Sequence, residues 1–194
     1  MDDRSGDGFD VAPGSLLVAG PGLADPNFRR TVVYLIEHRA GGSLGVVLNR
    51  PSEVQVRDVL PSWAPLASRP HAVFVGGPVD GQTALCLAAL RAGQDPSTVR
   101  GLVAVRGPVA LVDLESDPLA LAERLRGLRV FAGYAGWDGG QLAEEVDHGD
   151  WIVVPALPDD VLAGQESGLW EHVLRRQGMP LALLATYPVD VRRN

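Results

Sequence analysis

Polar residues that could bind an anion stand at the ends of two neighbouring apolar runs. Arg29 and Arg30 come directly before the first run, residues 31–36, and Asn49 and Arg50 come directly after the second. If the two runs pair as antiparallel strands, the start of one lies beside the end of the other. Guanidinium groups beside an amide suit an anion or a carboxylate. The alternative is that these side chains cap the strand ends and pair with acidic neighbours.

Glu37 and His38 form a second polar pair, at the far end of the run 31–36. A six-residue strand spans roughly 20 Å, so this pair and Arg29 cannot share one site directly. Glu37 and His38 could act as general acid and base in a hydrolase, or as half of a metal site. The other three histidines are scattered without the spacing of ligands, so we expect no metal and no cofactor. An exposed polar pair is the simpler interpretation.

Two glycine-rich segments follow predicted strands and could let a ligand approach the backbone closely. One is Gly76 and Gly77, and the other is the segment 133–141, which joins a strand to a helix. In the second segment we single out Tyr134, Gly136, Trp137 and Gln141. Its aromatic rings could stack on a flat ligand. The alternative is a tight chain reversal packed by Trp137.

The composition excludes several kinds of chemistry. All 17 residues counted as lysine or arginine are arginines, and the net charge is −7. Without lysine there is no Schiff base, no P-loop lysine and no lysine general base. No basic cluster exceeds an arginine pair, so the chain lacks the phosphate-neutralising patch of a nucleic-acid binder. Cys86 lies in an apolar stretch, which predicts a small buried side chain and not a nucleophile.

Short apolar runs bounded by Gly, Pro or Asn must position these residues. We predict strands at Leu16–Ala19, Thr31–Ile36, Leu44–Leu48, Ala72–Val75, Leu102–Val105, Val109–Val112, Arg129–Ala132 and Trp151–Val154. Most runs are continuously apolar, which implies a sheet covered on both faces. The tight connection at 106–108 predicts a hairpin.

Helices are predicted from their capping residues. A capping box at Ser52–Gln55 opens one helix, and Asp117 with Pro118 opens another that runs to Gly127. Asp138 with Gln141 opens a short helix through Val146, and the apolar face of 169–177 predicts a fourth. Strands occur both consecutively and between helices, so we expect an α+β fold with a mixed sheet.

The length of 194 residues fits a single domain. Residues 1–13 hold four aspartates and little to bury, so we expect a disordered acidic tail before a domain spanning 14–194. This tail has no apolar segment of a signal peptide, and no apolar stretch approaches about 20 residues. We therefore expect a cytoplasmic protein that does not bind membranes.

Several blocks, in order along nearly the whole chain, resemble the YqgE/AlgH family of bacterial proteins. They include Asp25-Pro-Asn-Phe-Arg-Arg-Thr-Val, Gly45-Val-Val-Leu-Asn-Arg-Pro51, Gly76-Gly-Pro-Val79 and Gly133-Tyr-Ala-Gly-Trp137. The resemblance implies an α+β fold with a split, barrel-like sheet flanked by helices, and an uncharacterised function. Part of the family carries a regulator label, but this sequence shows no helix-turn-helix with a basic recognition helix.

Three functions remain open at this point. The first is a non-catalytic module that binds a small ligand or a partner protein through the Arg and Asn residues and the glycine-rich turns, with an indirect regulatory role. The second is a hydrolase-like enzyme that uses Glu37 or His38. The third is a transcriptional regulator that binds DNA. We rank them in this order, because the chain lacks both catalytic spacing and a basic surface.

Overall fold

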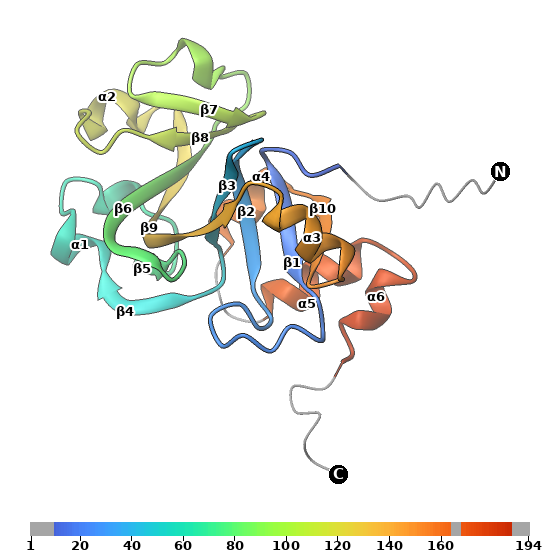
Figure 1. Ribbon diagram of the computed structural model, residues 1–194. Coiled ribbons are helices and arrows are strands. Elements are labelled where there is room, and N and C mark those ends of the chain that lie inside the picture. The colour runs from blue at the N-terminus through green and yellow to red at the C-terminus, as the bar shows by residue number, and fades with distance from the viewer. Residues whose placement is uncertain (1–9, 164–167, 188–194) are drawn as a thin grey trace.

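Ten strands form the framework of the protein, in a computed structural model that describes residues 10–163 and 168–187 (Figure 1). The strands are β1 (Ser15–Ala19), β2 (Val32–Arg39), β3 (Gly42–Val47), β4 (Pro51–Gln55), β5 (Ala72–Val75), β6 (Val79–Leu90), β7 (Leu102–Arg106), β8 (Val109–Val112), β9 (Leu125–Asp138) and β10 (Trp151–Pro155). The helices are α1 (Val56–Val59), α2 (Pro118–Ala122), α3 (Gln141–Asp147), α4 (Pro158–Leu162), α5 (Leu169–Arg176) and α6 (Leu181–Leu184), with 3-10 turns at Ala64–Leu66 and Pro96–Thr98.

The strand order is β10-β1-β2-β3-β9-β6-β8-β7, with β5 on β9 and β4 on β5. The pairing of β5 with β9 is parallel and the others are antiparallel, which confirms the mixed α+β sheet. The sheet is split because β9 changes partner along its length. Residues 125–134 of β9 pair with β6, whereas residues 135–138 pair with β3. Gly133 lies at this change in a left-handed conformation, with φ of 71°.

Two apolar cores fill the two halves of the split sheet. In the first core, residues 16–19 of β1 are completely buried, as expected for a strand covered on both faces. Helix α5 covers this half with its buried Trp170 and Val173. The second core lies between β6, β8, β9 and the α2 region, and contains Cys86. In Figure 1, α3, α5 and α6 gather beside β1 and β10, while α1 and β4 lie at the other end of the molecule.

The predicted capping box at Ser52–Gln55 is wrong. These residues belong to β4, and α1 begins only at Val56. The hydroxyl of Ser52 donates a hydrogen bond to the carbonyl of Val73 on β5, at 2.7 Å, and so supports strand pairing instead of a helix N-terminus. Local sequence favoured the helix, but pairing with β5 decides the structure.

The helix expected to run from Asp117 to Gly127 is shorter than predicted. Its start is confirmed, because the Asp117 carboxylate accepts the backbone N–H of Leu119 at 2.9 Å. The helix ends at Ala122, and residues from Leu125 onward pair with β6 as the start of β9. The helix predicted over 169–177 is confirmed as α5.

Residues 1–9 of the predicted acidic tail lie outside the described residues. Within the remainder of that tail, Val11 packs against the first core. Over the ranges 10–163 and 168–187, no helix has the length and apolar character needed to cross a membrane.

Candidate functional site

The antiparallel pairing of β2 with β3 brings the two polar strand ends together. The Asn49 side chain accepts the backbone N–H of Val32 at 3.0 Å and donates to the carbonyl of Arg30 at 2.9 Å. Arg50 donates from Nη2 to the carbonyl of Arg29 at 2.6 Å. Asn49 and Arg50 therefore hold the backbone of the loop that enters β2.

The guanidinium of Arg30 contacts helix α5, which covers the first core. Its Nη2 donates to Glu171 at 2.5 Å, its Nη1 donates to the carbonyl of Tyr187 at 3.0 Å, and the group lies 4.3 Å from the ring centroid of Trp170. Arg30 also adopts a left-handed backbone with φ of 56°, which is unusual for a residue with a side chain. Arg30 therefore fastens α5 to this loop, as in the alternative interpretation.

Glu171 responds electrostatically to this contact. Partial burial acts to raise the pKa of Glu171, but the hydrogen bond and charge of Arg30, together with the charge of Arg175, hold that pKa below its usual value. The ion pair with Glu171 therefore stabilises the fold and neutralises the charge of Arg30.

Arg50 differs because it lines an open cavity of about 300 Å³. The other lining residues are Pro26, Asn27, Val47, Pro51, Val75, Gly77 and Pro78. We call this space the Arg50 cavity. It joins three of the blocks recognised in the sequence: the loop after Asp25, the end of β3, and the turn after β5.

The Arg50 cavity carries positive charge that no carboxylate in the described ranges pairs with. Burial, and secondarily the charge of Arg29, lower the pKa of Arg50 below its ordinary value. Among the described residues, no acidic side chain lies within 4.0 Å of the guanidinium of Arg29 or Arg50. The cavity can therefore accept an anion.

The glycines Gly76 and Gly77 are required by backbone crossing. A Cβ at Gly76 would lie 2.2 Å from the carbonyl oxygen of Gly133, and one at Gly77 would lie 2.2 Å from the carbonyl of Tyr134. Gly77 also lines the Arg50 cavity. The glycine-rich turn thus brings β5 against β9 and shapes one wall of the cavity.

Trp137 packs inside the protein and does not face a ligand. Its side chain is buried beside Phe28 and Trp151, with ring centroids at 6.3 and 5.8 Å. The indole N–H groups of Trp137 and Trp151 both donate to Oε2 of Glu145, each at 2.8 Å. Gln141 donates to the other oxygen of Glu145, also at 2.8 Å. This cluster anchors the loop after Asp25 through Phe28.

The predicted capping of α3 by the Asp138 side chain takes a different form. The side-chain oxygen of Gln141 accepts the backbone N–H of Asp138 at 3.0 Å, and Gly140 occupies the cap position. Tyr134 is half-buried and Gly136 is exposed beside its ring. Neither residue lines the Arg50 cavity.

Glu37 and His38 lie at the far end of β2, apart from the Arg50 cavity. His38 Nδ1 and the hydroxyl of Ser43 are 2.7 Å apart across the β2–β3 pair, and Glu37 pairs with Arg39 at 3.5 Å. Both residues line a separate cavity of about 230 Å³ against β7 and β8. Within the described part of the chain, no three His, Cys, Asp or Glu side chains cluster as metal ligands would.

Sequence reasoning missed the apolar walls beside the Arg50 cavity. Val75 lines this cavity and also a larger, nearly apolar groove of about 400 Å³. The groove draws its side chains from β4, α1, β5, β6 and β9, so no single segment of sequence marks it. The structure marks the groove by the 46% exposure of Val54 and Val75, apolar residues in strands, which cannot be read from the sequence.

Comparisons with known proteins place this architecture in one family. Residues 16–182 match the sequence model of a family described as AlgH-like. A UPF0301 protein of Rhodococcus opacus is 59% identical over 184 residues, covering 95% of this chain and 92% of the relative. A UPF0301 protein of Mycobacterium tuberculosis is 55% identical, with 95% of this chain and 91% of the relative covered.

Two solved structures share the fold. The crystal structure of a Corynebacterium diphtheriae protein has a TM-score of 0.91 and 38% identity, over 94% of this chain and 96% of that one. The solution structure of the AlgH protein from Pseudomonas aeruginosa has a TM-score of 0.64 and 28% identity, over 94% and 99% of the two chains.

Proposed function

This chain belongs to the AlgH-like family, and we propose that it is a non-catalytic module that binds a carboxylate or similar anion in the Arg50 cavity. The observation that carries the proposal is the half-buried guanidinium of Arg50, which lines an open cavity beside a second guanidinium and has no carboxylate partner among the described residues. Hydrogen bonds to charged groups are worth more than neutral ones, especially where water is partly excluded.

The remaining contacts of Arg50 support a binding role. Its Nη2 is fixed by the carbonyl of Arg29, so the group is already oriented before a ligand arrives. A preorganised donor loses less conformational entropy on binding than a free side chain. Asn27 is a further polar residue that lines the cavity.

This proposal assigns any regulatory effect to the bound ligand or to a protein partner. Contact with DNA is disfavoured because a net charge of −7 lacks the phosphate-neutralising term that supports nucleic-acid binding. The buried single thiol, Cys86, fits a reducing compartment, and we propose the cytoplasm.

The test is a titration of the protein with butyrate and with inorganic phosphate at low ionic strength, followed by two-dimensional NMR. We expect saturable shifts at the amides of Asn27, Arg50 and Gly77. Arg50→Gln removes the charge and should weaken binding about tenfold. Arg100→Gln, which removes a charge from an exposed position, is the matched control and should bind normally. Equal binding by the two variants would refute the assignment.

A further inference from the structure

A nearly apolar groove lies beside the Arg50 cavity. Five of its lining residues are valines, Val54, Val59, Val73, Val75 and Val130, and we call it the valine groove. Val54, Val59 and Val75 are 46%, 53% and 46% exposed. Its volume of about 400 Å³ lies within the range of small-molecule sites, which are mostly apolar with a few placed polar groups.

The valine groove and the Arg50 cavity are neighbours that share Val75 of β5. Strand β4 begins with Pro51 in the wall of the Arg50 cavity and continues with Ser52 and Val54 in the wall of the groove. A ligand with its charged end at Arg50 would pass Val75 to reach the other valines.

Two of the three polar side chains that line the valine groove, Ser52 and Thr83, are already hydrogen-bonded within the protein, and the third is Gln82. The Ser52 hydroxyl donates to the carbonyl of Val73 at 2.7 Å, and the Thr83 hydroxyl donates to the carboxylate of Asp80. A peptide placed here would bury backbone N–H and C=O groups with few partners, at a cost of roughly 1–3 kcal/mol for each unsatisfied group. An alkyl chain has no such groups to desolvate.

We propose that the Arg50 cavity and the valine groove form one site for an amphipathic carboxylate, a small molecule with an alkyl body. The carboxylate accepts hydrogen bonds from Arg50, and the alkyl body replaces water along the valines. Charge complementarity at one end and apolar walls at the other select this ligand chemistry over a peptide. The inference rests on the proposed anion-binding function and adds the chemical class of the ligand.

The experiment measures dissociation constants for straight-chain carboxylates of increasing length, from butyrate upward and below their micelle concentrations, by isothermal titration calorimetry. Each methylene that enters the groove should tighten binding roughly fourfold until the groove is filled. Arg50→Gln should weaken binding of the longest carboxylate about tenfold, and should leave the 1-alkanol of equal length unaffected.

A second variant tests the groove itself. Val59→Asp places a charge at a groove residue that is 53% exposed, and should abolish most of the gain with chain length. Val103→Asp is the matched control, because Val103 is also an exposed valine, 63% accessible, and lies on β7 outside the groove. This control should retain the full gain.

The outcomes separate the two proposals. If butyrate binds at Arg50 but chain length has no effect, the groove inference is wrong and the anion site stands. If long carboxylates bind equally well to the protein and to Arg50→Gln, the single-site inference is wrong. If no carboxylate binds, both fail. A dimer that Val59→Asp dissociates, detected by sedimentation, would assign the groove to a second copy and overturn the ligand proposal.

Discussion

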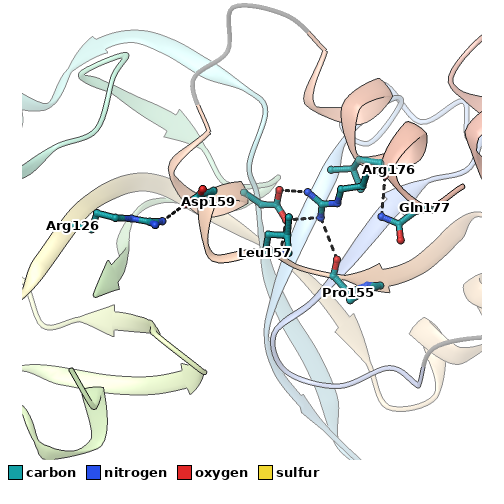
Figure 2. Close-up of polar contacts among 8 residues, drawn as sticks. Arg126, Pro155, Leu157, Asp159, Arg176 and Gln177 are labelled. Carbon is teal, nitrogen blue, oxygen red and sulfur yellow. Dashed lines mark hydrogen bonds and ion pairs between the residues drawn. The ribbon is translucent and has the colours of Figure 1, made fainter. Parts of the chain in front are cut away.

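Two neighbouring aspartates of α4 pair with arginines in contrasting surroundings, and their contributions to stability should differ accordingly (Figure 2). Asp160 is 4% exposed and accepts two N–H groups of Arg176, at 2.5 and 2.6 Å. It also accepts the backbone N–H of Leu157 at 2.6 Å. Asp159 pairs with Arg126, but its side chain is 78% exposed. The two residues share one helix and one residue type, so each serves as the control for the other.

Asp160→Asn keeps the size of the side chain and removes its charge. The guanidinium of Arg176, only 19% exposed, would then face an amide N–H₂ or a single neutral oxygen. Breaking a buried ion pair in this way costs about 3–5 kcal/mol. Asp159→Asn disrupts a solvent-exposed pair, which is worth less than about 1 kcal/mol. For a protein of this size, the melting temperature should fall by roughly 6–20 °C for the first and under about 4 °C for the second.

The assay is urea unfolding followed by circular dichroism, at about 0.05 M and about 1 M NaCl, where the Debye length falls to about 3 Å. High salt should erase the small loss of Asp159→Asn and leave the large loss of Asp160→Asn. A change in the midpoint at constant slope would show that stability itself has changed. If Asp160→Asn loses no more than Asp159→Asn, the buried pair does not hold α4 to α5 and the reasoning is wrong.

Glu145→Leu should cost about 2–4 kcal/mol in urea unfolding and shift the tryptophan emission, because two buried indole N–H groups lose their acceptor; the exposed neighbour Glu144→Leu should change little. Gly76→Ala should cost about 1–3 kcal/mol, since its Cβ would lie 2.2 Å from a backbone oxygen, whereas Gly22→Ala has open space and should melt normally. The pKa of Glu171 is lowered in the folded protein, so its ion pair contributes its full stability above the unfolded pKa of about 4.3. This stability is lost as pH falls through the folded pKa. In Glu171→Gln the urea midpoint should therefore fall less on acidification than in the unsubstituted protein.

Sequence predicted most strands because burial on both faces leaves a continuous apolar run. Residues 16–19 and 109–112 needed no knowledge of their neighbours to be recognised. Strands β4 and β6 were both missed. The residues of β4 and of the first half of β6 are largely polar and exposed, so only pairing with β5 and β9 makes them strands. Residues 86–90 of β6 are buried but consist mainly of Ala and Leu, which favour helices, and pairing with β8 and β9 makes them a strand.

The candidate site was only partly predictable. The closeness of Arg50 to Arg29 followed from antiparallel pairing of two recognisable strands. The ion pair of Arg30 could not be predicted, because its partner Glu171 lies 141 residues away along the chain. The burial of Trp137 was also not predictable. Its indole N–H donates to Glu145, and nothing in the sequence distinguishes Glu145 from an exposed helical glutamate.

The contrast between Arg30, Arg176 and Arg50 is the strongest argument for a binding role. The fold gives Arg30 and Arg176 each a carboxylate within 2.5 Å. Among the described residues, Arg50 instead donates to a backbone carbonyl, lies near the repulsive charge of Arg29, and has no carboxylate that compensates its positive charge. An anion that enters the Arg50 cavity relieves this repulsion in the folded state alone. By mass action such an anion must raise the melting temperature, by an amount that grows with its concentration relative to its dissociation constant.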